Sequence, residues 1–271
     1  MSDKASWVLA GSASLRAWPR AQFAYRSDPR FSYCVHVPKA PARRLLVAVH
    51  GTGRNAMAYR DALAAFAEAE GYLVLAPLFP VGVLGDFNPD GYKYMAEQGL
   101  RYDRILLGMI DELEQLLSAR FERFSLFGFS GGGHFAHRFF YLHPERLRSV
   151  SVGAPGGVTL LDDTRNFWIG TRDFRERFGT APDLAAMRQV PAQILIGSED
   201  QAAFVYPPHV GHHVADMESL GRNRLERSAT LLANWLDHGL QARRDVIAGV
   251  GHEGLKAIPA LEAFLRELPP D

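Results

Sequence analysis

The sequence has a single cysteine and no excess of charge of either sign. Cys34 is the only cysteine among 271 residues, so no disulfide can form within the chain. It sits in an apolar run, and we expect an inert, buried thiol. Thirty basic and thirty acidic residues give a formal net charge of zero. Because nucleic-acid binding needs a basic face, the sequence predicts no nucleic-acid partner.

Long hydrophobic runs are also missing. No stretch approaches the ~20 apolar residues of a membrane span, so no membrane partner is expected. Residues 1–18 lack a basic segment followed by the apolar stretch of a secretory signal. The expected compartment is therefore the cytoplasm.

Apolar content is sufficient for one large core. The chain is 47% hydrophobic, and α/β folds of 271 residues commonly form one domain. Short apolar runs alternate with segments whose apolar residues recur at helical spacing. We therefore expect a single α/β domain over residues 1–271, with a doubly wound, mostly parallel sheet and helices on both faces. The expected strands cover 31–37, 45–49, 72–76, 124–127, 149–152 and 192–196, with another from 245; the expected helices cover 55–70, 102–120, 131–143, 222–238 and 255–265.

The most informative motif lies between a strand and a helix. Residues 124–133 read FSLFGFSGGG, an apolar strand followed by Gly-x-Ser-x-Gly and the start of a helix. Gly128 and Gly132 are needed because the chain folds back so sharply that side chains there would collide. The pattern predicts a nucleophilic serine, Ser130, at the tip of a tight turn.

A serine nucleophile of this type needs a carboxylate and a histidine later in the chain, in that order. Asp200 follows the strand 192–196, and His252 follows the strand that begins at 245. Both lie beyond the carboxyl ends of strands, where open α/β sheets place their sites. Glu199 competes with Asp200 for the role of the acid. Three other carboxylates are weaker alternatives for the acid: Asp162, Asp163 and Asp216.

From about Phe31 onward the chain resembles the α/β-hydrolase superfamily. Residues 50–53, His-Gly-Thr-Gly after a buried strand, resemble the oxyanion loop of that family. The resemblance implies that the backbone N–H groups of Thr52 and Gly131 bind the oxyanion. The residues around Ser130 and His252 look most like esterases of the polyhydroxyalkanoate depolymerase, feruloyl esterase and dienelactone hydrolase neighbourhood. The nucleophile is not the cysteine that dienelactone hydrolases use, which puts their activity in doubt here.

The expected activity is hydrolysis of a small-molecule carboxylic ester through an acyl-enzyme, without a metal or organic cofactor. Three alternatives stay open: acyl transfer or perhydrolysis, amide or peptide hydrolysis, and a non-catalytic binding protein of the same fold.

Long connections point to the substrate pocket. Residues 156–190 fall where α/β hydrolases often insert a cap, and we expect a small lid there. Phe167 and Trp168 are candidates to line the pocket together with Gly53 and His134, although a satellite core would equally explain the two aromatics.

A histidine cluster raises the question of a metal site. His209, His212 and His213, with Asp216 beyond, include residue types that bind zinc. Neighbouring proline and glycine argue against an ordered helix there, so no metal site is predicted. The sequence leaves the oligomeric state open, with a homodimer as one option.

Overall fold

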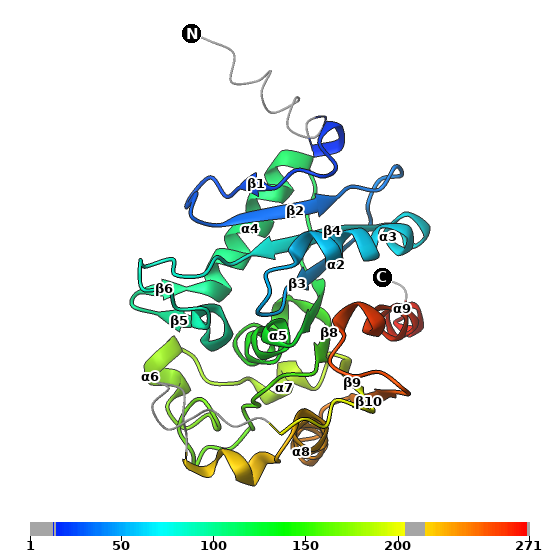
Figure 1. The fold of residues 1–271 in the computed structure, drawn as a ribbon. Helices are drawn as coiled ribbons and strands as arrows, with labels where there is room; N and C mark the ends of the chain where they lie inside the picture. Colours follow the sequence, from blue (N-terminus) through cyan, green and yellow to red (C-terminus); the bar gives the residue numbers. More distant parts are fainter. Residues whose placement is uncertain (1–12, 14, 204–214, 270–271) are drawn as a thin grey trace.

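The computed structural model describes residues 13, 15–203 and 215–269 (Figure 1). Its centre is an eight-stranded sheet in the order β1-β2-β4-β3-β7-β8-β9-β10. β1 and β2 pair antiparallel, as do β2 and β4, whereas the remaining neighbours run parallel. The strands are β1 (Phe23–Ala24), β2 (Ser32–His36), β3 (Arg44–Val49), β4 (Tyr72–Leu78), β7 (Phe124–Phe129), β8 (Leu147–Gly153), β9 (Ala192–Gly197) and β10 (Ala242–Ile247). A separate hairpin joins β5 (Ala96–Glu97) to β6 (Leu100–Arg101).

Helices connect the strands. The α-helices are α2 (Ala56–Ala62), α3 (Ala64–Glu70), α4 (Tyr102–Leu117), α5 (Gly131–Leu142), α6 (Phe174–Phe178), α7 (Leu184–Met187), α8 (Arg224–Asp237) and α9 (Ile258–Glu267). Short 3-10 turns are η1 (Gly91–Tyr94), η2 (Pro144–Arg146), η3 (Ala215–Leu220) and η4 (Gly254–Ala257). None of the described helices combines the length and the apolar character that a membrane crossing requires.

The sheet is buried on both faces, as its near-continuous apolar strands predict. Successive residues of β3 point to opposite sides: Val47 joins the core under α4, α5 and α8, whereas Ala48 joins the core under α2, α3 and α9. Cys34 on β2 is fully buried, as expected. Burial raises the pKa of its thiol.

Several element boundaries differ from the sequence prediction. The helix expected over 55–70 is divided at Leu63, whose fully buried side chain fixes the junction in the core. β10 begins at Ala242, before the expected start at 245, and ends at Ile247, ahead of the turn at Gly249, where φ is 67°. The last helix opens with the 3-10 turn η4 and becomes α-helical at Ile258, where the following proline suits the first turn.

The parallel strands bring distant loops to one edge of the sheet. β3, β7, β8, β9 and β10 are hydrogen-bonded in that order and run parallel, so their carboxyl ends lie together. The loops after these strands carry Thr52, Ser130, Asp200 and His252. The fold therefore places the residues singled out in the sequence on the same side of the molecule.

Candidate active site

Ser130 occupies the sharp turn between β7 and α5. Its backbone has φ 58° and ψ −113°, a left-handed conformation that costs a non-glycine residue of order 1–3 kcal/mol. A hydrogen bond from the Ser130 amide to the Gly153 carbonyl, at 2.8 Å, fixes the turn against β8. The strained turn carries the side chain away from the sheet toward the loops that surround it.

The two glycines of the motif are required by close backbone approach. A Cβ atom on Gly128 would lie 2.1 Å from the carbonyl oxygen of Gly132. A Cβ atom on Gly132 would lie 2.1 Å from the carbonyl oxygen of Val49 on β3. Neither contact can be relieved by rotating a side chain, so both positions exclude every other residue type.

Ser130, His252 and Asp200 form a hydrogen-bonded series. The Oγ atom of Ser130 lies 2.9 Å from Nε2 of His252, and Nδ1 of His252 lies 2.6 Å from Oδ2 of Asp200. With Nδ1 protonated, His252 donates to Asp200 and leaves Nε2 to accept the serine proton. The series has the connectivity that activates a serine hydroxyl.

The loops after β9 and β10 hold the acid and the base together. The Glu199 amide donates to the Val250 carbonyl at 2.9 Å, and the Gly249 amide donates to Oγ of Ser198 at 2.9 Å. A Cβ atom on Gly197 would lie 2.1 Å from the Val250 carbonyl oxygen, so the two loops are in direct contact.

The structure distinguishes the two candidate acids. Asp200 is buried, with 3% of its surface exposed, whereas the adjacent Glu199 is exposed. The second oxygen of Asp200, Oδ1, accepts from Nη1 of Arg224 at 3.3 Å. Burial raises the pKa of Asp200, but the hydrogen bond from His252 and the charges of His252 and Arg224 outweigh it, so the pKa lies below its usual value. Asp200 is therefore the carboxylate that faces His252.

The loop after β3 lies against the nucleophile. A Cβ atom on Gly51 would lie 3.4 Å from Cβ of Ser130, and one on Gly131 would lie 3.1 Å from the Thr52 amide nitrogen. Within the described residues, neither the Thr52 nor the Gly131 amide donates to a protein acceptor. The Thr52 and Gly131 amides thus lie near each other and line the cavity that contains Ser130, with Gly131 at the positive end of α5.

His50 fixes this loop rather than facing the substrate. The fully buried ring approaches the Gly51 carbonyl through Nδ1 at 2.8 Å and accepts from the Phe79 amide through Nε2 at 2.9 Å. Burial lowers the pKa of His50 to about 4, which keeps the ring neutral. His50 therefore orients this loop through its two hydrogen-bonding contacts.

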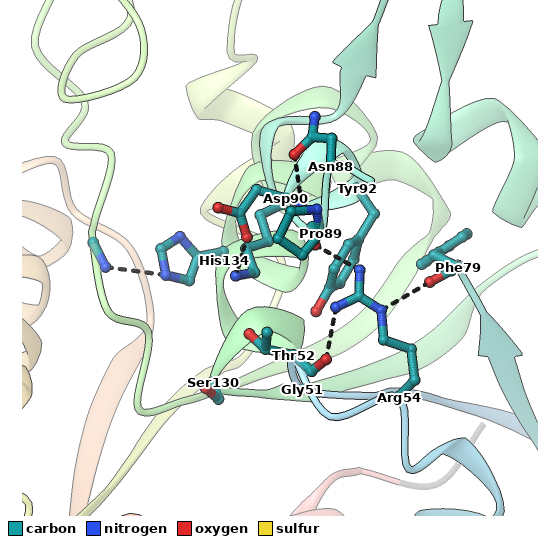
Figure 2. A network of polar contacts seen from close by, with 12 residues as sticks. Gly51, Thr52, Arg54, Phe79, Asn88, Pro89, Asp90, Tyr92, Ser130 and His134 are labelled. Atoms are coloured by element: carbon teal, nitrogen blue, oxygen red, sulfur yellow. Dashed lines mark hydrogen bonds and ion pairs between the residues drawn. The ribbon is translucent and has the colours of Figure 1, made fainter. Parts of the chain in front are cut away.

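Arg54 ties the same loop to its surroundings (Figure 2). Its guanidinium donates to the Thr52 carbonyl at 2.6 Å, the Phe79 carbonyl at 3.2 Å and the Pro89 carbonyl at 2.5 Å. The guanidinium also lies over the ring of Tyr92, 5.2 Å from its centroid. Sequence reasoning missed Arg54 because two of its carbonyl partners, those of Phe79 and Pro89, come from segments remote in the chain.

A cavity of about 310 Å³ opens above Ser130. Pro89 and Asp90, from the segment after β4, lie over Thr52 and Ser130 (Figure 2). The lining residues are Thr52, Pro89, Asp90, Lys93, Ser130, Gly131, His134, Gly156 and Arg224. Of the predicted pocket residues, His134 therefore lines the cavity. Gly53 lies beside it on the exposed loop and is not among the lining residues.

Phe167 and Trp168 point elsewhere. Trp168 is 5% exposed within the main core, and Phe167 lines a different cavity of about 400 Å³ with Tyr94 and Phe178. Residues 156–190, which contain α6 and α7, thus direct these aromatics into packing rather than toward Ser130. A lid role for the segment stays a prediction.

Among the described residues, the remaining candidates form no metal site. His209, His212 and His213 lie outside the described residues. Within the described part of the chain, no three His, Cys, Asp or Glu side chains are grouped closely enough to hold a metal ion. Asp162 accepts from Thr164 and Arg165, which are local loop contacts.

A larger cavity of about 570 Å³ is lined by Arg44 and Arg148 among others. These residues lie at the amino ends of β3 and β8, opposite the edge that carries Ser130. That cavity holds none of the predicted site residues.

Solved structures of similar fold include hydrolases and esterases. Poly(aspartic acid) hydrolase-1 from Sphingomonas sp. KT-1 has a TM-score of 0.69 and 22% identity, over 88% of this chain and 93% of that one. A poly(3-hydroxybutyrate) depolymerase from Bordetella parapertussis has a TM-score of 0.68 and 22% identity, over 89% of this chain and 87% of that one. A ferulic acid esterase has a TM-score of 0.60 and 14% identity, over 92% of this chain and 97% of that one.

No protein-family model matches the chain, and no curated protein matches it. The structural likeness nevertheless extends over most of each chain, and the sheet order and the predicted fold class agree with it. The chain therefore has the α/β-hydrolase fold.

Proposed function

We propose that the chain is a serine hydrolase that cleaves a carboxylic ester through an acyl-enzyme intermediate. The observation that carries the proposal is the continuous series from Ser130 Oγ through the His252 ring to Asp200, with 2.9 and 2.6 Å between the polar atoms. Similar folds in proteins named as esterases and as a depolymerase support the same reaction class.

The geometry gives each residue a role in this reaction. Oγ of Ser130 attacks the ester carbonyl while Nε2 of His252 accepts its proton. Asp200 holds the imidazole in the required tautomer and stabilises the imidazolium. The Thr52 and Gly131 amides bind the oxygen that becomes negative in the tetrahedral intermediate. His252 then protonates the leaving alcohol, and a water activated by the same ring releases the acid.

Hydrolysis of 4-nitrophenyl esters, from acetate to decanoate, tests the proposal. The cavity is small, and among its described lining residues Pro89 alone has an apolar side chain, so we expect the shortest esters to react best. Ser130→Ala should lose at least about a thousandfold in kcat/KM. Ser27→Ala, at an exposed position in the N-terminal part of the fold, is the matched control and should retain wild-type rates. Equal activity in Ser130→Ala and the wild type would overturn the proposal.

A further inference from the structure

Two cationic side chains line the cavity above Ser130. Lys93 from η1 and Arg224 from the start of α8 line the same cavity of about 310 Å³. Among the described lining residues, Pro89 alone has an apolar side chain. The two cations give the cavity donors for a charged substrate group.

Lys93 lies beside Gly131, the residue after the nucleophile. Its Cε atom lies 3.1 Å from the place that a Cβ atom on Gly131 would occupy. The side chain is 8% exposed, and its ammonium donates to Oδ1 of Asp90. Because an ammonium carries three donors, this bond to Asp90 leaves Lys93 capable of contacting a ligand as well.

Arg224 stands on the wall formed by α8. Its side chain is 16% exposed and meets the 1% exposed side chain of Asp200. A group bound between Lys93 and Arg224 would therefore lie between the loop after β4 and the start of α8, in the cavity that contains Ser130.

Two further arginines lie near this cavity. Arg54 donates to three carbonyl oxygens, including that of Pro89 on the cavity wall. Arg138 is fully buried and donates to the Thr159 hydroxyl and the Lys93 carbonyl. Both arginines add to the positive charge that Lys93 and Arg224 bring to the cavity wall.

These positive charges also affect the pKa of His134, which lies on the cavity wall. Burial and then the charges of Arg138, Lys93 and Arg224 hold its pKa well below the usual value. Lys93 behaves likewise: burial lowers its pKa, Asp90 opposes the change, and Arg54 and Arg138 reinforce it. An anion in the cavity would relieve this repulsion in a partly dehydrated site, where charge-assisted hydrogen bonds are strong.

We propose that the substrate is an ester that carries a carboxylate, which binds between Lys93 and Arg224. The inference rests on the proposed hydrolase function and specifies its substrate class. Lys93 then acts in substrate selection, and Arg224 contacts both the substrate carboxylate and Asp200.

Two pairs of esters that differ in charge but little in size provide the test. On the acyl side, the 4-nitrophenyl monoester of adipic acid is compared with 4-nitrophenyl methyl adipate. On the alcohol side, 4-acetoxybenzoate is compared with its methyl ester. In at least one pair we expect kcat/KM of the anion to exceed that of the neutral ester by about tenfold or more.

Lys93→Met should reduce this ratio by about tenfold, and Lys93→Arg should restore most of it. Lys39→Met removes the same charge at an exposed position remote from the cavity, and should leave the ratio unchanged. A ratio near one in both pairs, or an equal loss for both members in Lys93→Met, would overturn the inference. Ser130-dependent hydrolysis of the neutral esters would still uphold the proposed function, so the two can fail separately.

Ionic strength gives a second measurement that needs no variant. For the wild type, raising sodium chloride from about 0.02 M to about 0.5 M should lower kcat/KM of the anionic ester several-fold more than that of its neutral partner. Equal salt dependence would contradict the inference even if Lys93→Met did not fold.

Discussion

The Oδ2 atom of Asp200 lies 2.6 Å from Nδ1 of His252, although the two residues are 52 positions apart. Parallel pairing of β9 with β10 makes this contact possible, because it brings the carboxyl ends of both strands to one place. Asp200 is enclosed by protein, and its other oxygen is held by Arg224. The geometry orients the imidazole so that Nε2 faces Ser130.

Asp200→Asn should lower kcat by roughly 10³–10⁴-fold, because an amide cannot stabilise the imidazolium and favours the wrong ring tautomer. Glu199→Gln is a matched control, since it removes the adjacent but exposed carboxylate. Steady-state kinetics on a neutral ester should show Glu199→Gln within about threefold of the wild type. If the two variants lost activity equally, Asp200 would not be the acid.

Arg54→Met should reduce kcat by about tenfold or more with a smaller change in KM. The substitution removes the hydrogen bonds from Arg54 to the Thr52, Phe79 and Pro89 carbonyls, so the Thr52 amide is no longer held in place. Loss of one oxyanion donor costs ~10²–10³ in rate, and a loosened donor should cost less. Arg54→Lys should recover part of the loss. Arg30→Met, at an exposed pair with Asp28, is the control. A change in KM alone would contradict the positioning role.

Gly128→Ala should destabilise the fold by at least about 1–3 kcal/mol, because the new methyl group meets the Gly132 backbone. Gly53→Ala adds the same methyl group on the oxyanion loop, where no atom lies within 4 Å. Urea unfolding should therefore show a large loss for Gly128→Ala and little change for Gly53→Ala. Similar midpoints for both variants would show that the turn is looser than the structure indicates.

Acid should destabilise the protein through three buried histidines, His50, His134 and His137. Burial lowers the pKa of each in the folded state, to about 4 for His50 and well below the usual value for the other two. Below about pH 6.5 the unfolded chain therefore binds more protons than the folded one. The free energy of unfolding consequently decreases as the pH is lowered. From pH 7 to pH 5 His50 should cost about 2 kcal/mol, and His134 and His137 should add to this loss.

His137→Gln provides the comparison for this pH effect. His137 contacts the Gly133 carbonyl and accepts from the Thr159 amide, and glutamine can both donate and accept. The unfolding free energy of His137→Gln should fall less steeply between pH 7 and pH 5 than that of the wild type. Identical slopes would mean that His137 titrates normally in the folded protein.

Short-range patterns predicted the sheet and the residues at its carboxyl edge. The Gly-x-Ser-x-Gly turn is local, and strand ends can be located from apolar runs, so Ser130, Asp200 and His252 could be selected before any contact was known. β1 covers Phe23–Ala24 only and carries no periodic signal, so it was not predicted. The helix over 55–70 was expected to be continuous because helical spacing persists across Leu63.

The cationic cavity wall could not be found in the same way. Lys93 and Arg224 are 131 residues apart in the sequence. They line one cavity because the segment after β4 and the start of α8 both border it. Phe167 and Trp168 illustrate the converse problem. Aromatic residues in a long connection suit a substrate pocket and a core equally, and only packing shows that Trp168 is buried in the core.

Covalent labelling by a fluorophosphonate tests the central claim most directly, because it needs no knowledge of the substrate. Peptide mass spectrometry should locate the phosphonate on Ser130, and His252→Gln should slow labelling by at least about a hundredfold. Labelling at Ser130 that depends on His252 would establish an activated nucleophile in the folded protein. No labelling, or labelling that persists in Ser130→Ala, would contradict the account.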